Sequence, residues 1–206
     1  FRSGMAVNCN GKSGGLALWW RDTVQVTVRP WCQYFVDAEI VWEGKTCRFT
    51  GFYGEPNNEL RKKSWDAIRY LRAQDSLPWL CAGDFNEALF HTDQIGGNRR
   101  SFAQMEDFRE CLADCGLVDL GFSGYPYTWD NKRDAGDNIQ VRLDRATCDE
   151  AFLDLFPETT VEHVLTEESD HQALVIRALE TAPRQKQCGD FPFRFEEAWT
   201  THDQYD

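Results

Sequence analysis

Short apolar runs separated by turn residues dominate the first third of the sequence. Residues 16–20 form a compact apolar run, and residues 24–28 alternate between apolar and polar side chains. A period of two is typical of a half-buried strand. Residues 34–42 and 47–53 are two further strand-like runs, and Glu43-Gly44-Lys45 between them predicts a hairpin turn. This part of the chain therefore predicts antiparallel strands.

The period changes in the middle of the chain. Residues 59–74 carry apolar side chains at helical spacing, with Lys and Arg on the other face, and predict an amphipathic helix with the stripe Leu60, Trp65, Ile68 and Leu71. Residues 77–82 predict a buried strand that ends in the polar turn Gly83-Asp84-Phe85-Asn86.

A second helix has clearer end signals. Ser101 and Gln104 form a capping box, and Gly116 ends the helix. Its apolar stripe consists of Met105, Phe108, Leu112 and Cys115. Further strands are expected at residues 117–120, 139–143, 161–165 and 172–176.

Helices interleaved with many strands, several of them antiparallel, predict an α+β fold in which sheet packs on sheet and helices lie outside. Periodicity ends after Ala182-Pro183. We therefore expect one domain over residues 1–182 and a linker with the start of a connector over residues 183–206.

Composition narrows the class of protein. The chain has 206 residues, 42% of them hydrophobic, which excludes general disorder. The net charge of −12 argues against a protein that coats nucleic acid by charge alone, but it allows carboxylates gathered around a divalent cation. No apolar run reaches the roughly 20 residues of a membrane span, and no secretory signal opens the chain, so an intracellular protein is expected.

The eight cysteines show no C-x-x-C spacing, which favours reduced thiols over a zinc site or a disulfide framework. Cys47 and Cys81 lie in apolar runs and are expected to be buried. Cys111 and Cys115 would face the same side of the second helix.

Polar residues lie at the ends of several apolar strands, either just after or just before them, where a rigid support brings side chains together. They are Tyr53, Asp84, Asn86, Asp144, Asp170 and His171. Carboxylates, an amide, an imidazole and a phenol suit metal-assisted phosphate chemistry with Mg²⁺. Taken singly, each has a simpler interpretation: an Asx-turn at Asp84, a turn cap at Ser169 or Asp170, a surface ion pair at Asp144 and a core or rim position for Tyr53.

Four short motifs follow one another along the chain: Gly83-Asp84-Phe85-Asn86, Tyr127-Thr128-Trp129, Arg142-Leu143-Asp144 and Ser169-Asp170-His171. In this order they resemble the motifs of the endonuclease/exonuclease/phosphatase superfamily, which includes apurinic endonucleases and DNase I-like nucleases. Longer phrases are similar to one branch, the endonuclease domains of plant non-LTR (LINE-type) retroelements. These phrases are GGLALWW at 14–20, GFYGEP at 51–56, LPWL at 77–80 and CGLVDL at 115–120.

The resemblance implies a two-sheet, four-layer α/β/β/α sandwich of the DNase I-like type and a Mg²⁺-dependent DNA endonuclease, with Mn²⁺ as an alternative metal. It implies that Asp84 activates the attacking water and that Asn86 positions that water or contacts the phosphate. His171 would contact the scissile phosphate, oriented by Asp144, and Tyr53 would hydrogen-bond a phosphate oxygen.

Three further expectations come from the same resemblance. Asp170 would lie at or beside the metal, and the loop 129–138, with Trp129, Lys132 and Arg133, would lie beside the DNA. Three aspartates in that loop offset its charge, so a solvated turn is an equal alternative. The tail at 193–199 resembles a connector towards a reverse transcriptase, which implies a nuclear parent protein.

One departure from the family bears on activity. Members have an upstream Asn-bearing strand end and then a strand that ends in the metal-binding Glu; neither occurs before Gly14, and the first glutamate is Glu39. We therefore expect the chain to lack the first strands and helix of the fold and the principal metal ligand, and to cleave slowly. A phosphatase or phosphodiesterase on the same scaffold is the alternative enzyme, and a non-catalytic remnant or binding module is the alternative of another class.

Overall fold

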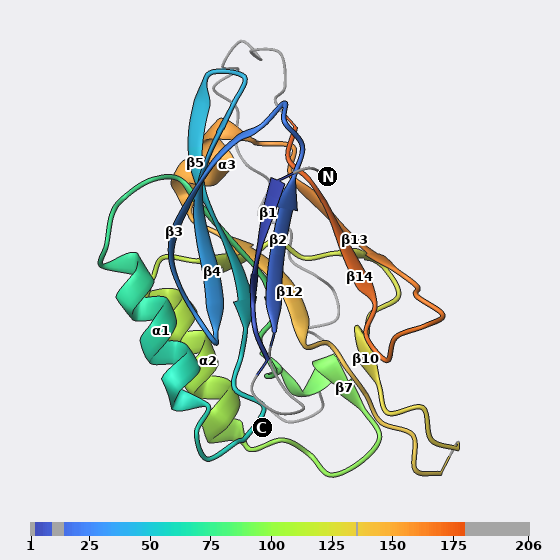
Figure 1. Ribbon diagram of the computed structural model, residues 1–206. Coiled ribbons are helices and arrows are strands. Elements are labelled where there is room, and N and C mark those ends of the chain that lie inside the picture. Colours follow the sequence, from blue (N-terminus) through green and yellow to red (C-terminus); the bar gives the residue numbers. More distant parts are fainter. Residues whose placement is uncertain (1–2, 10–14, 135, 180–206) are drawn as a thin grey trace, which may run out of the picture.

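The computed structural model describes residues 3–9, 15–134 and 136–179. The expected linker and connector at 183–206, with Cys188, lie outside the described residues, as does most of the turn before residue 16. Figure 1 shows a layered arrangement in which two long helices lie along one side of the strands.

The centre of the fold is a six-stranded sheet in which only β5 and β6 run parallel. Its strands, in spatial order, are β3 (Gln25–Cys32), β4 (Phe35–Trp42), β5 (Lys45–Tyr53), β6 (Trp79–Asp84), β12 (Asp144–Cys148) and β8 (Val118–Asp119). The expected hairpin joins β4 to β5 through Glu43 and Gly44, both with positive φ, as a two-residue turn requires.

Two helices cover one face of this sheet, α1 (Lys62–Arg72) and α2 (Phe102–Asp114). Trp65 of α1 stacks on Phe108 of α2 at 4.5 Å between ring centroids, and both side chains are buried on the sheet-facing side of the helices. The stripe predicted for α2 is confirmed, because all four of its members are buried. Leu60 is wrongly placed in the stripe of α1: it precedes the helix and is 40% exposed.

The sequence predicted the C-terminal end of α2 correctly and its N-terminal end only in part. Ser101 is the N-cap residue, but its side chain makes no capping hydrogen bond, so the predicted capping box does not form. Gly116 ends the helix as expected: its N–H donates to the Ala113 carbonyl and that of Leu117 donates to the Leu112 carbonyl.

A second layer covers the other face of the central sheet. It contains the three-stranded sheet β14 (Ala173–Arg177), β13 (Thr160–Val164) and β9 (Ser123–Gly124), and the antiparallel pair β1 (Ser3–Val7) and β2 (Leu16–Trp20). Val161, Leu174 and Ile176 of this layer pack on Ala82 and Ala146 of the central sheet. The predicted α+β sandwich is therefore confirmed.

Helix α3 (Glu150–Leu155) and strand β1 were not predicted. Asp149 is the N-cap of α3 and its carboxylate accepts the Phe152 N–H, but six residues are too few to show helical periodicity. None of the helices in the described part of the chain is long and apolar enough to cross a membrane.

A small sheet lies at the end of the sandwich where the predicted site residues meet. Its strands are β10 (Trp129–Asp130), β11 (Gln140–Val141) and β7 (Gln94–Ile95), the last preceded by the 3-10 turn His91–Asp93. One expectation is corrected here. Asp144 does not end a strand at 139–143 but begins β12, because the chain leaves the small sheet after Val141 and joins β6 of the central sheet.

Candidate active site

Three of the predicted residues form a row across neighbouring strands. Tyr53 is paired with Asp84, and Asp84 is paired with Asp144, at the ends of β5, β6 and β12. Directly paired residues point to the same face of a sheet. The next residues on that face are Gly51, Ala82 and Ala146, so the row lies at the end of the core between the two layers.

Local geometry explains why a glycine precedes Asp84. Gly83 has φ +144°, and a Cβ there would lie 2.0 Å from the carbonyl oxygen of Phe52 on β5. No other residue fits this close approach of two backbones. The glycine therefore allows β6 to stay beside β5 up to the point where Asp84 emerges.

The turn after Asp84 is held by its own side chains. The backbone N–H of Asn86 donates to Asp84 Oδ1 at 2.7 Å, and Asn86 Nδ2 donates to Asp84 Oδ2 at 3.0 Å and to the Gly54 carbonyl at 2.8 Å. Asn86 has φ +56°, a conformation that asparagine tolerates better than most residues. The Asx-turn therefore forms, and it also connects the end of β6 to the end of β5.

His171 completes the group from the second layer. Its Nδ1 lies 2.8 Å from Asp144 Oδ2, and because a carboxylate can only accept, Nδ1 carries the proton. The N–H of His171 donates to Ser169 Oγ, so the expected local turn forms as well. Nε2 is then the imidazole atom left to act on a substrate.

The charges of the group shift two pKa values. Burial, and then the negative charge of Asp144, raise the pKa of Asp84 to about 6, while His171 and the Asn86 N–H act in the opposite direction. Burial opposes the charged form of His171, but the hydrogen bond and charge of Asp144, with the charges of Asp84 and Asp170, outweigh it and raise the pKa of the imidazole. Near neutral pH, Asp84 is thus a carboxylate able to accept a proton, beside a histidine biased towards its charged form.

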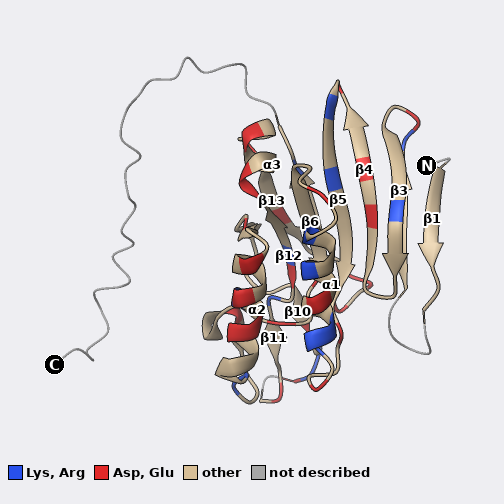
Figure 2. Cartoon of the chain, turned by 90° about the vertical axis from the view of Figure 1, so that its left-hand side faces the viewer, with Lys and Arg blue, Asp and Glu red and all other residues tan. Residues whose placement is uncertain are grey.

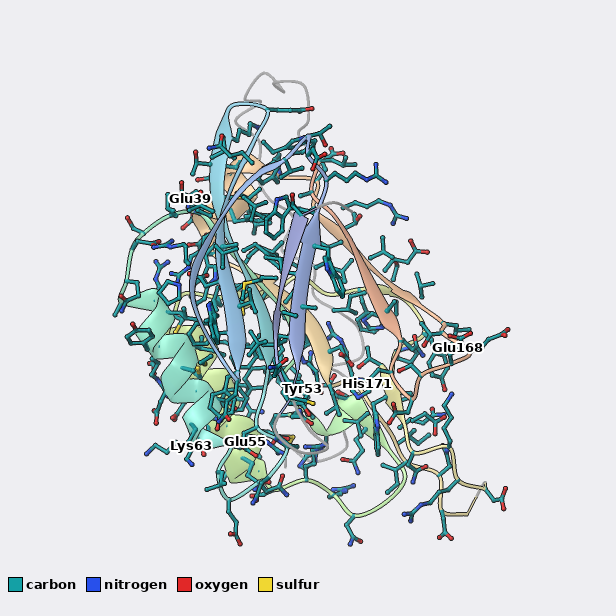
Figure 3. All side chains as sticks on the ribbon, viewed as in Figure 1. Glu39, Tyr53, Glu55, Lys63, Glu168 and His171 are labelled. Atoms are coloured by element: carbon teal, nitrogen blue, oxygen red, sulfur yellow. The ribbon has the colours of Figure 1, made fainter. Side chains whose placement is uncertain are left out.

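The remaining predicted residues are Trp129, Lys132, Arg133 and Asp170. They lie beyond His171 as seen from the row of paired strand ends. Asp170 Oδ2 accepts the indole N–H of Trp129 at 3.0 Å, and Trp129 is bridged to His171 through the backbone. Lys132 and Arg133 are in the exposed loop after β10, where Asp130 Oδ1 accepts the Lys132 N–H. In Figure 3, Tyr53 and His171 are labelled in the same region, whereas Glu39 lies towards the opposite end of the molecule.

Two hollows flank His171, and Trp129 and His171 line both. The larger, which we call the arginine cleft, has a volume of about 610 Å³ and extends from Asn86 and His171 to Arg99 and Arg100. The smaller, the acidic pocket, has about 260 Å³ and is lined by Asp130 and Asp170 as well as by Lys132.

Two sets of positioning residues were missed from the sequence. Thr128 is fully buried, and its Oγ1 accepts the N–H groups of Leu143 and Asp144, which places the start of β12. Glu87, also fully buried, binds Arg61 at 2.6 Å and Arg100 at 2.8 Å just beneath Asn86. A glutamate between the apolar residues Phe85 and Ala88-Leu89 is the only sequence signal for the second set.

The donor atoms fit a divalent cation only in part. Asp84 already accepts two hydrogen bonds from Asn86, Asp144 holds His171, and Asp170 holds Trp129. Among the described residues, no three His, Cys, Asp or Glu side chains converge as metal ligands would. We therefore assign no catalytic step to a metal.

Comparison with known proteins places the chain in a family. The model of the Endonuclease/Exonuclease/phosphatase family matches residues 5–171, and the chain belongs to this family. Its fold is that of the DNase I-like nucleases. No curated protein sequence matches the chain.

Solved structures support the same fold. The endonuclease domain of TRAS1, a telomere-specific non-LTR retrotransposon, is similar with a TM-score of 0.68 and 21% identity, over 88% of this chain and 83% of that one. A family protein from Leptotrichia buccalis has a TM-score of 0.54 and 20% identity, over 86% and 72%. Humanized D. rerio TDP2 has a TM-score of 0.53 and 16% identity, over 84% and 74%.

Proposed function

We propose that the chain hydrolyses phosphodiester bonds, with DNA as substrate, as an endonuclease domain of a retroelement-derived protein. The observation that supports this most directly is the convergence of the Asp84–Asn86 turn with the Asp144–His171 pair at one end of the arginine cleft. Asp84 as general base and His171 as a positively charged donor are then within reach of one scissile bond whose phosphate enters the cleft.

Each residue has a role that its contacts allow. Asp84 accepts the proton of the attacking water, and Asn86 fixes that water or a phosphate oxygen. His171, oriented by Asp144, donates from Nε2 to a non-bridging phosphate oxygen, and its raised pKa keeps that proton in place. Tyr53 donates its hydroxyl to a second oxygen. Water adds to phosphorus as the bond to O3′ breaks, and the departing O3′ takes a proton from solvent, which leaves a 3′-OH end and a 5′-phosphate.

Magnesium is proposed as the cofactor, with manganese as a substitute; it would supply positive charge at the phosphate. Asp170 is the carboxylate proposed to lie nearest to it. Because the described donor set is incomplete, we propose weak metal binding and slow cleavage by this chain. The contacts of Trp129, Lys132 and Arg133 with DNA, the connector at 183–206, a following reverse transcriptase and a nuclear location stay proposals that rest on the resemblance.

A nicking assay tests the proposal. Supercoiled plasmid is incubated with the wild type and with Asp84→Asn, in Mg²⁺, in Mn²⁺ and in EDTA. We expect slow nicking that both the substitution and EDTA abolish. Asp66→Asn, an exposed carboxylate on α1, is the matched control and should nick as the wild type does.

Two outcomes would contradict the proposal. Release of phosphate from a small phosphomonoester without plasmid nicking would favour the phosphatase, an alternative supported by the net charge of −12. No hydrolysis of either substrate by the wild type would favour the non-catalytic remnant, an alternative supported by the incomplete metal donors.

A further inference from the structure

Two arginines form a ridge between the arginine cleft and a second hollow. Arg99 and Arg100 line the cleft of about 610 Å³ and also the neighbouring hollow of about 290 Å³. No Asp or Glu is among the residues that line either hollow. In a chain with a net charge of −12, whose acidic residues are prominent on α2 and α3 in Figure 2, this is a marked separation of charge.

The ridge keeps positive charge even though a glutamate lies beneath it. Glu87 is fully buried and binds both Arg61 and Arg100, so two guanidinium groups share one carboxylate and a charge of 2 − 1 = +1 is left. Arg100 also donates to the carbonyl of Asn86, which connects the ridge to the catalytic turn.

Arg99 adds a second uncompensated charge. Its side chain is exposed, and it makes no ion pair with any residue in the described part of the chain. A pair of positive charges near the catalytic turn attracts an anion that extends beyond the scissile phosphate.

Part of the lining of the arginine cleft is apolar. Its residues Trp129, Ile139, Val141 and Leu143 pack in one hydrophobic cluster, which we call the apolar floor, and the polar residues Asn98 and Gln104 also line the cleft. An apolar floor beside a cationic ridge matches a nucleic-acid strand, whose sugars and bases alternate with phosphates. A small phosphate would leave the apolar floor unused.

We propose that Arg99 and Arg100 bind the phosphates of a DNA strand next to the scissile phosphate, so that the chain selects polymeric DNA over small phosphate esters. This inference rests on the proposed function, because it takes Asn86 and His171 as the cleavage point. Arg100 is held in place by Glu87, whereas Arg99 is free to adjust to the strand.

Fluorescence anisotropy tests this with a labelled 20-base-pair DNA duplex in EDTA, where binding is measured without cleavage. Arg99→Gln is expected to bind about three- to tenfold more weakly and to reduce the dependence of log affinity on log salt by about one. Arg99→Lys should restore most of the affinity. Arg21→Gln is the matched control: Arg21 is exposed and precedes β3, whose first residue pairs with Val41, at the other end of the sheet from Tyr53.

Equal affinities of Arg99→Gln and the wild type, or equal losses in Arg99→Gln and Arg21→Gln, would overturn the inference. The inference would also be overturned if inorganic phosphate, or vesicles containing phosphoinositides, displaced the duplex from the wild type at concentrations that do not displace it from Arg99→Gln. The plasmid assay is independent of this result. Nicking that needs Asp84, together with normal DNA binding by Arg99→Gln, would overturn this inference alone.

Discussion

The arginine cleft and the acidic pocket share the wall formed by Trp129 and His171 but carry opposite charge. On the cleft side, the buried carboxylate of Glu87 is neutralised by two arginines. On the pocket side, the partners of Asp130 among the described residues are neutral donors, the Lys132 N–H, Asn138 and Gln140, and Asp170 accepts from the Trp129 indole. The cleft is therefore positive because arginines line it and the one carboxylate beneath it is paired, whereas the pocket is negative because two aspartates line it.

Under the proposed function, this difference suits the cleft to the phosphates of DNA and the pocket to a cation. Hydrogen bonds, first that of the Lys132 N–H, lower the pKa of Asp130 and keep its carboxylate charged. Negative charge on that side repels phosphates and attracts cations, while the cleft does the reverse. His171, between them, is where a phosphate and a cation would meet.

The largest effect is expected at the shared wall. Asp144→Asn removes the charged acceptor that orients His171, so plasmid nicking should fall by a factor on the order of 10³. DNA affinity in EDTA should change by less than about twofold, because Asp144 is absent from the lining of the cleft. Asp154→Asn on α3, an exposed carboxylate, is the control. A comparable loss of rate in the control would show that Asp144 has no special role.

Among the residues on the cleft side, Glu87 should contribute most to the free energy of unfolding. Glu87→Ala leaves buried Arg61 without its counter-charge and should lower the free energy of unfolding by about 3–5 kcal/mol, measured by urea denaturation. The comparison is Glu162→Ala, which breaks an exposed pair with Arg177 and should cost less than about 1 kcal/mol. Equal costs for the two would contradict the account of the ridge.

The pH dependence of the unfolding free energy should reveal the raised pKa of Asp84. Its pKa is raised from the usual 3.8 to about 6, so the folded state holds this proton more tightly, and stability is lost as pH rises between these values. The raised pKa of His171 adds stability that is present below its unfolded pKa and lost as pH rises through its folded pKa. Asp75 and Asp119 have lowered pKa values and contribute in the opposite direction, losing stability as pH falls.

Because those groups titrate over overlapping pH ranges, the quantity to measure is the difference in unfolding free energy between Asp84→Asn and the wild type. This difference in unfolding free energy should shift in favour of the variant by about 2 kcal/mol from pH 4 to pH 7. Urea denaturation at several pH values gives it. Parallel stability curves for the two proteins would show that the Asp84 pKa is not raised.

The smallest effect is expected on the acidic side. Lys132→Gln combined with Arg133→Gln should weaken DNA binding by about twofold, less than Arg99→Gln alone, because the neighbouring aspartates already offset these charges. Anisotropy in EDTA compares the variants directly. A larger loss than for Arg99→Gln would make the 129–138 loop, rather than the arginine ridge, the main DNA contact.

Much of the molecule was predictable from local sequence. Strands β2 to β6 follow from short apolar or alternating runs, and helices α1 and α2 follow from a period of 3.6; both signals are properties of neighbouring residues. Tyr53, Asp84 and His171 were predicted as site residues because the ends of strands collect polar side chains and because their motifs resemble a family. Their convergence in the structure agrees with that expectation.

Only the tertiary structure decided the surroundings of these residues. Arg61 and Glu87 are 26 positions apart, and Thr128 lies 16 positions from the Asp144 that it places. Burial and charge pairing depend on which distant segments pack together, so periodicity does not encode them. The sequence by itself determined the elements and the chemical groups, whereas the fold decided which carboxylates are neutralised and therefore the sign of the charge on each side of His171.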